Sequence, residues 1–265
     1  MFTPVSFHIG GAEVLLRISP GEFTTAGGEV FADTGPWLAD PIAGVARGAL
    51  AVALDDVTGY AIAAGVPADR WPVSLGIRVD FLADPSTCPG RLSVTGEVVG
   101  RDSRGGTTRG AVTDDDGEVL AIAVQRSHLI QSTGLSAAVA AGSLVDADAP
   151  IRSQLGLVDA EDAPAGAVAL AMPATPLAAN GMGNVHGGML IAVSELAAMS
   201  AIDARCEYRT TSIDIAYVRP CDAAAPTTFT AEPQHVGRSL AVVRVVAANP
   251  SGKPSSIATV ILQRR

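Results

Sequence analysis

A short segment in the second half of the chain gathers groups that could act on a carbonyl. Residues 180–188 read N-G-M-G-N-V-H-G-G, and a long apolar run follows directly. If a helix begins at the two glycines, its first backbone N–H groups can stabilise negative charge on a bound carbonyl oxygen. Gly187 and Gly188 would let that backbone approach a ligand closely, because they carry no side chain.

Hydrolysis at such a carbonyl also needs a carboxylate that activates water or attacks directly. An internal repeat supplies two candidates. Residues 46–61 and 186–201 align without a gap, and the tenth residue of each is acidic, Asp55 in the first copy and Glu195 in the second. Asp56 follows Asp55, but about 100° of helix rotation separates neighbouring residues, so only one of them can point at a glycine loop. The alignment of the repeat favours Asp55. The apolar neighbours of Asp55 argue against an ordinary surface carboxylate.

The repeat continues beyond these segments. Three further pairs resemble one another in the same order: 74–82 and 210–218, 99–101 and 236–238, and 121–126 and 260–264. Four matches in one order indicate a duplicated module. We therefore expect two domains, residues 1–130 and 151–265. The stretch 131–150 between them is rich in small residues and is typical of a linker.

Each half has the same expected order of elements. An extended segment (13–18 and 166–172) precedes a glycine loop, an apolar helix (49–64 and 189–204) and four strands. In the second half these strands are expected near 211–218, 227–232, 240–248 and 256–263. The helical runs are apolar nearly all round, which is typical of a buried helix. One long buried helix wrapped by an antiparallel sheet is the hotdog arrangement, so the sequence predicts an α+β double hotdog.

The N-x₅-H-G-G pattern, with a carboxylate nine residues after its histidine, resembles the signature of the PaaI-like hotdog thioesterases. Residues 214–220 and 236–238 also resemble that family. The resemblance covers most of 166–264 well and 14–126 more faintly. It implies an acyl-CoA thioesterase, with coenzyme A as part of the substrate and no metal or other cofactor.

In that family the loop comes from one hotdog unit and the carboxylate from the helix of the other. The resemblance therefore implies one complete catalytic set: Asp55, Asn180, His186, Gly187 and Gly188. A second, degenerate site would combine Glu195 with Asp40, Arg47 and Gly48, where Ala46 replaces the histidine. Hydroxyls that could assist with the water are Thr210, Thr211 and Ser212. His186 could instead be a buried structural residue, and the hydroxyls could be ordinary strand residues.

Composition excludes several other classes. The net charge of −9 and the absence of a basic cluster disfavour nucleic acid. Three cysteines without a C-x-x-C pair disfavour disulfides and structural zinc, which fits a cytoplasmic protein. The start of the chain does not resemble a signal peptide, and the apolar run 189–202 is too short to span a membrane.

Two further questions stay open in the sequence. The rival function is a non-catalytic acyl-CoA or lipid-binding protein, in which the fold persists without turnover. A hotdog hydratase would need a different Asp/His pairing. The acyl group cannot be read from the residues, and assembly into a homo-oligomer of such double units is compatible with the sequence.

Overall fold

The computed structural model describes residues 6–132, 134, 144–146, 148–160 and 163–265. The larger elements of the first half are α1 (Gly11–Leu15), β1 (Ile18–Phe23), β2 (Gly27–Thr34), α2 (Leu50–Ala63), β5 (Arg70–Phe81), β6 (Gly90–Asp102), β7 (Gly105–Thr113) and β8 (Val119–Gln131). Those of the second half are α3 (Ile151–Gln154), β9 (Val158–Asp159), β10 (Val168–Met172), α4 (Gly187–Ala201), β11 (Tyr208–Tyr217), β12 (Thr227–Val236), β13 (Leu240–Ala248) and β14 (Pro254–Arg264). Short connecting elements are β3 (Ala39–Asp40), β4 (Gly44–Val45) and the 3₁₀ turns η1 (Pro36–Leu38), η2 (Arg47–Ala49) and η4 (Pro176–Ala178).

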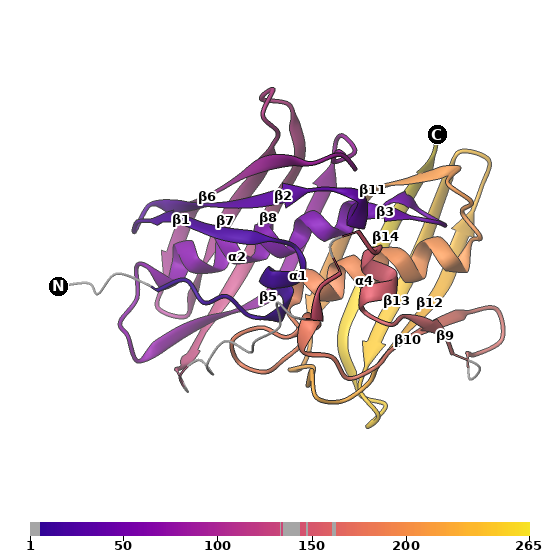
Figure 1. Ribbon diagram of the computed structural model, residues 1–265. Helices are drawn as coiled ribbons and strands as arrows, with labels where there is room; N and C mark the ends of the chain where they lie inside the picture. Colours follow the sequence, from indigo (N-terminus) through magenta and orange to yellow (C-terminus); the bar gives the residue numbers. More distant parts are fainter. Residues whose placement is uncertain (1–5, 133, 135–143, 147, 161–162) are drawn as a thin grey trace.

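The two halves share one antiparallel sheet. Its twelve strands run in the order β1-β2-β6-β7-β8-β5-β11-β14-β13-β12-β10-β9, with the first half on one side and the second on the other (Figure 1). The halves join where β5 pairs with β11, with Ile77 opposite Ile215. The two strands of this central pair are equivalent in the repeat, because β5 contains most of 74–82 and β11 most of 210–218.

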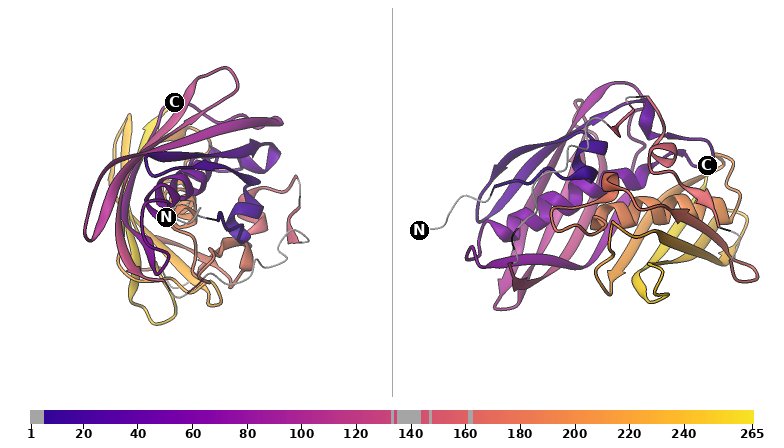
Figure 2. Two further views of the ribbon diagram at one scale, coloured as in Figure 1. Left: turned by 90° about the vertical axis from the view of Figure 1, so that its left-hand side faces the viewer. Right: turned by 60° about the horizontal axis from the view of Figure 1, so that its bottom comes forward.

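The two long helices, α2 and α4, lie on the same side of the sheet, which curves around them (Figure 2). Side chains from all faces of these helices are buried, among them Leu54, Val57, Met189 and Leu196. Their uniformly apolar sequences thus match a position between the sheet and the segments that cover them. The buried helices and the double-hotdog architecture predicted from the sequence are confirmed.

The two long helices come into close contact at Gly188. A Cβ there would lie 2.4 Å from the backbone oxygen of Ala51. Gly48 has the equivalent place in the first repeat, and its Cβ would lie 3.0 Å from the Cα of Ala192. Glycine at both positions lets the beginning of each helix meet the other helix, and this contact brings the loop of each half to the carboxylate of the other.

Some element boundaries differ from expectation. The strands expected near 211–218, 227–232, 240–248 and 256–263 correspond to β11–β14. Most of the segment 13–18 is not extended, because its first three residues end α1 and the next two form a turn before β1. Glu13 accepts a hydrogen bond from the N–H of Gly10 (2.9 Å) and so caps the helix. Helix α4 begins at Gly187, two residues before the predicted start. Much of the predicted linker, including residues 135–143, lies outside the described residues.

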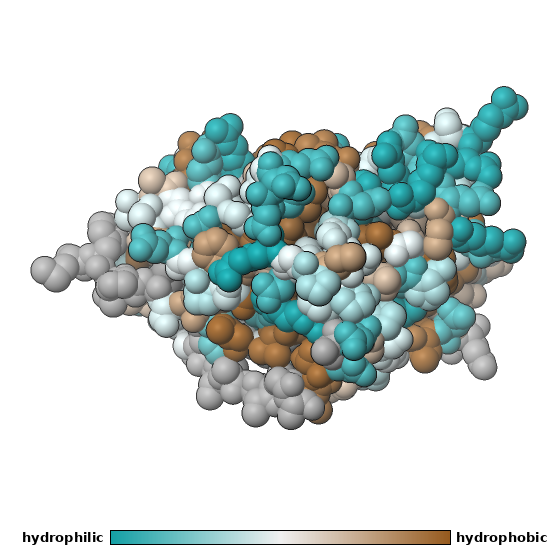
Figure 3. All heavy atoms as spheres, turned by 45° about the horizontal axis from the view of Figure 1, so that its top comes forward, coloured by the Kyte–Doolittle hydropathy of each residue, from teal (hydrophilic) through white to brown (hydrophobic). Residues whose placement is uncertain are grey.

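The face shown in Figure 3 is largely hydrophilic, with hydrophobic residues gathered in limited patches. Within the described residues no helix is both long and apolar enough to cross a membrane. The large apolar side chains that remain exposed include Ile122 and Val124 of β8. Single exposed apolar residues of this kind are common on folded proteins.

Candidate active site

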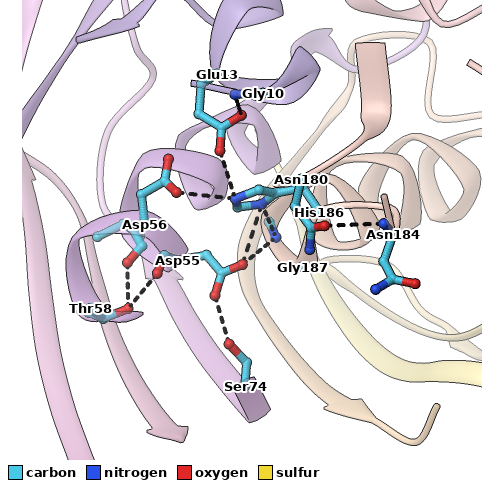
Figure 4. A network of polar contacts seen from close by, with 12 residues as sticks. Gly10, Glu13, Asp55, Asp56, Thr58, Ser74, Asn180, Asn184, His186 and Gly187 are labelled. Carbon is cyan, nitrogen blue, oxygen red and sulfur yellow. Dashed lines mark hydrogen bonds and ion pairs between the residues drawn. The ribbon is translucent and has the colours of Figure 1, made fainter. Parts of the chain in front are cut away.

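The carboxylate of Asp55 on α2 meets the beginning of α4. Its Oδ2 accepts a hydrogen bond from the N–H of Gly188 (3.1 Å) (Figure 4). The N–H groups in the first turn of a helix have no intrahelical partner, so an acceptor there is favourable. The structure thus brings Asp55 of the first half to the glycine loop of the second, as the sequence predicted.

Two side chains on the sheet hold the other oxygen of Asp55. Ser74 Oγ on β5 donates to Oδ1 (2.8 Å), and Gln125 Nε2 on β8 donates to the same oxygen (2.9 Å). The Gln125 amide also contacts Ser74 Oγ. Together with Gly188, these donors fix the orientation of the carboxylate. Hydrogen bonds to a charged group are worth about 1.5–3 kcal/mol each.

Neither donor was predicted from the sequence, although the repeat contained a signal for Ser74. Ser74 is the counterpart of Thr210, where a helpful hydroxyl was expected. Gln125 was not recognised because the alignment of the two repeats matched 121–126 with 260–264, which is the wrong register. In the sheet Gln125 lies opposite Ile77, and Val260 lies opposite Ile213, so the counterpart of Gln125 is Val260.

His186 precedes α4 and caps it. Its Nδ1 lies 3.1 Å from the Gly188 nitrogen and 3.4 Å from Oδ2 of Asp55. Its Nε2 lies 3.2 Å from Oδ1 of Asp56 and 3.6 Å from Oε1 of Glu13. Burial alone would lower the pKa of the ring, but the three surrounding carboxylates raise it to about 10.

The expectation that only one of the two aspartates reaches the loop is wrong. Asp55 contacts one nitrogen of His186 and Asp56 contacts the other. The imidazole lies between them, so two residues about 100° apart on the helix can reach opposite sides of one ring. Burial, reinforced by Glu13, raises the pKa of Asp56 to about 7. Glu13 was missed because it lies far from the loop in sequence, on the short helix α1.

Asn180 has a structural task in the loop. Its Oδ1 accepts the N–H groups of Met182 (2.9 Å) and Asn184 (3.1 Å), which closes the turn before His186. The side chain still borders the cavity described below. Its oxygen is therefore occupied, and its NH₂ group is the part left to contact a ligand.

Gly187 differs from Gly188 in its backbone N–H. No acceptor for it is found among the described residues, whereas its carbonyl accepts the hydroxyl of Tyr217 (2.8 Å). A Cβ at Gly187 would lie 2.5 Å from Oδ2 of Asp55, so a side chain there would displace the carboxylate. Burial and the nearby charge of Asp55 raise the pKa of Tyr217, which keeps its hydroxyl protonated.

These groups border a cavity of about 420 Å³, within the usual range of small-molecule sites. Asp55, Asn180, His186 and Gly187 all line it. The other walls are mostly apolar, with Tyr60, Trp71, Val73, Leu75, Ile130, Met182, Leu190, Tyr217 and Val218. Arg219 also borders the cavity.

The pseudo-equivalent site around Glu195 has the same framework but is closed. Gly48 N–H donates to Oε2 of Glu195 (2.6 Å), just as Gly188 donates to Asp55. Arg47 is buried beside it, pairs with Asp84 (2.5 Å) and donates to the carbonyl of Thr210 (2.9 Å). Burial raises the pKa of Glu195 to about 7.

Asp40 of the predicted second site and the predicted auxiliary hydroxyls Thr211 and Ser212 lie away from the cavity. Asp40 pairs with Arg152 (2.7 Å), and Thr211 donates to the carbonyl of Ile261 (3.1 Å). Ser212 is buried opposite Asp80 in the sheet. None of these side chains borders the cavity at Asp55.

One group in the described part of the chain has the spacing of a metal site. Ligand atoms of Glu13, Asp56 and His186 all lie within 4.8 Å of one another. The sequence predicted no metal, and no C-x-x-C or comparable local spacing marks these residues. Two carboxylates around an imidazole also form an ordinary ion-pair cluster, so the expected absence of a metal stays a prediction.

The second half of the chain is similar to a known protein family. Residues 175–263 match the family model described as acyl-CoA thioesterase N-terminal domain. No curated protein matches the chain. The matched segment contains the loop, α4 and β11–β13 with most of β14, so it is the second hotdog unit that carries the match.

Solved structures match the whole two-unit architecture at low sequence identity. A TesB protein from Mycobacterium avium subsp. paratuberculosis has a TM-score of 0.66 at 12% identity, covering 97% of this chain and 100% of the other. The acyl-CoA thioesterase II TesB2 from Mycobacterium marinum has 0.65 at 14%, covering 96% and 98%. A putative thioesterase II from Thermobifida fusca has 0.67 at 10%, covering 97% and 98%. At such identities the likeness establishes the fold.

Proposed function

Because the second half of this chain carries an acyl-CoA thioesterase domain of the hotdog superfamily, we propose that the protein hydrolyses acyl-CoA thioesters at the cavity between its halves. The observation that carries this proposal is the meeting of Asp55 with the N-terminus of α4 at the cavity. The PaaI-like pattern of residues 180–188 supports the same assignment. No cofactor is required beyond the coenzyme A of the substrate.

The thioester oxygen would bind at the N–H of Gly187. This amide belongs to the first turn of α4 and has no acceptor within the described structure, so it is available to a ligand. Negative charge that develops on the oxygen would be stabilised by this donor and by the positive end of the helix dipole. Gly188 was expected to share this role, but its N–H already holds Asp55.

Asp55 would act on the carbonyl carbon. Either it removes a proton from an attacking water, or its carboxylate attacks first and forms an anhydride that water then hydrolyses. Both routes need a carboxylate held in one orientation, and Ser74, Gln125 and Gly188 provide three donors for this purpose. The cleaved bond is the one between the carbonyl carbon and sulfur, and the sulfur leaves as coenzyme A.

The cavity supplies the binding surface. Its apolar walls suit the acyl chain, and the NH₂ group of Asn180 can orient the water or the thioester. Arg219 is the arginine that borders the cavity, and we assign it to the phosphates of coenzyme A. The pseudo-equivalent site is assigned no turnover, because Arg47 fills the space beside Glu195.

The test is thiol release from short, medium, long and aromatic acyl-CoAs by the purified protein. The proposal predicts turnover of at least one class above the rate without protein. A chain that binds acyl-CoA, measured by calorimetry, but releases no thiol from any class would be a binding protein, and the proposed function would be wrong. Carrier-protein thioesters serve as a parallel series.

A further inference from the structure

His186 is surrounded by three carboxylates, although a single hydrogen-bond partner would be enough to orient the ring. Asp55 lies at Nδ1, and Asp56 and Glu13 lie at Nε2 (Figure 4). Glu13 is 3% exposed, Asp56 4% and His186 5%. The acidic residues come from α1 and α2 of the first half, whereas the ring belongs to the second.

The imidazole is the only partner that could neutralise these acids within the described residues. Every ion pair found there for Glu13, Asp55 and Asp56 has His186 as its cation. Buried carboxylates without a counter-charge are costly. A proton on both ring nitrogens would give each side of the ring an N–H to donate and would place one positive charge among the acids.

The amide of Gly188 permits that second proton. Its nitrogen lies 3.1 Å from Nδ1 of His186 and also 3.1 Å from Oδ2 of Asp55. In a neutral ring, Nδ1 could accept this N–H. In a charged ring, Nδ1–H donates to Oδ2 of Asp55 (3.4 Å) and no longer accepts the N–H of Gly188, which keeps the same oxygen of Asp55 as its acceptor, so no buried donor is left unpaired. A neutral ring would leave the acids to share protons among themselves.

We propose that Asp56 and Glu13 are positioning residues that hold His186 as an imidazolium, with Nε2–H toward Asp56 and Nδ1–H toward Asp55. Neither acid needs to touch the substrate for this role. The cation beside Gly187 and Asp55 would stabilise the negative charge of the transition state. The kinetic consequence rests on the proposed thioesterase function, whereas the charge state of the ring does not.

The two tyrosines near the ring do not change the charge around His186 in the pH range of the test. Tyr60 and Tyr217 both have raised pKa values because of burial and nearby carboxylates, so they stay neutral at ordinary pH. The three carboxylates raise the pKa of His186, and burial with Glu13 raises that of Asp56 to about 7. Between pH 7 and 9, Asp56 is therefore ionised, and a change in kcat in this range reflects the protonation of His186.

The kinetic test is the pH profile of Asp56→Asn. Asparagine keeps an oxygen that can accept Nε2–H but removes the charge, so the ring should lose its proton at lower pH. We expect kcat near that of the parent at pH 6.5 and lower by at least about 10-fold at pH 9, with KM changed little. Glu195→Gln, a buried carboxylate on the equivalent helix of the closed site, is the matched control and should keep the parent profile. An Asp56→Asn profile parallel to that of the parent would overturn the proposal.

Ring ¹⁵N chemical shifts test the charge directly. The chain has four histidines, so His186 can be assigned by comparison with His186→Gln. We expect both ring nitrogens protonated at pH 8 in the parent and a neutral ring at pH 8 in Asp56→Asn. A neutral ring in the parent would refute the proposal even if thioesters are hydrolysed. A charged ring in a protein that hydrolyses no thioester would uphold it and refute the proposed function.

Discussion

Replacing Glu195 with glutamine is expected to stabilise the protein, and increasingly so at high pH. Glu195 is fully buried, and burial raises its pKa from 4.5 to about 7. The folded state therefore binds this proton more tightly than the unfolded state. As pH rises from 4.5 to 7 the unfolded carboxyl ionises first, so stability falls across this window and the full cost is reached above pH 7.

The size of the effect follows from the shift in pKa. About 2.5 pKa units correspond to roughly 3 kcal/mol of unfolding free energy above pH 7, with little of it present near pH 4.5. Glutamine removes the ionisation but keeps an oxygen that can accept the N–H of Gly48. We expect the stability gain of Glu195→Gln to be larger at pH 8.5 than at pH 5 by about 2–3 kcal/mol.

Urea unfolding of parent and variant at both pH values measures this difference. The exposed Glu232→Gln provides a control, and its effect should not change with pH. If the stability gain of Glu195→Gln is the same at pH 5 and pH 8.5, Glu195 has the same charge at both values. The raised pKa of this buried carboxyl would then be refuted. A variant destabilised at both values would instead indicate that the electrostatic attraction between Glu195 and Arg47 outweighs the cost of burying the charge.

Three other substitutions test the geometry of the site. Gln125→Leu removes a donor to Asp55 and should lower kcat about 10- to 100-fold, since such a bond is worth about 1.5–3 kcal/mol; unchanged kcat would show that Gln125 does not hold the carboxylate. Tyr217→Phe removes the bond to the carbonyl of Gly187 and should cost about 0.5–1.5 kcal/mol of stability in urea unfolding, a loss that a non-contributing hydroxyl would not show. Gly188→Ala places a Cβ 2.4 Å from a backbone oxygen of α2 and should lower stability by about 1–3 kcal/mol; a full-stability variant would contradict the close helix contact.

The repeat was the strongest signal in the sequence. Alignment of 46–61 with 186–201 needed no gap, because helix length and the spacing from loop to carboxylate are fixed by the crossing of α2 and α4. It supplied Asp55 as a candidate carboxylate, and the family resemblance implied that Asp55 meets the glycine loop across the halves; the contact with Gly188 is present. The buried helices were equally predictable from their uniformly apolar composition.

Side chains brought together by the sheet or by distant segments were not predictable in the same way. Gln125 reaches Asp55 through the register of β8 on β5, which pattern matching placed wrongly. Glu13 reaches His186 because α1 crosses to the second half, where the N–H of Ala12 donates to the carbonyl of Ala179 (3.2 Å). Such contacts depend on tertiary packing and leave no local periodicity to detect.

The closure of the second site was foreseen only in part. The sequence showed that Arg47 replaces the first glycine of the motif. The structure places its guanidinium against Asp84 and the carbonyl of Thr210. A buried arginine with two internal partners has no reason to bind an outside anion.

The most direct test of the central claim compares Asp55→Asn with Glu195→Gln on the best acyl-CoA substrate. The two residues are equivalent in the repeat, and each accepts the N–H of a glycine from the other half, but only Asp55 borders the cavity. We expect Asp55→Asn to lower kcat by at least about 100-fold, whereas Glu195→Gln should stay within about 3-fold of the parent. Turnover retained by Asp55→Asn, or lost in Glu195→Gln with the fold intact, would show that hydrolysis does not depend on Asp55.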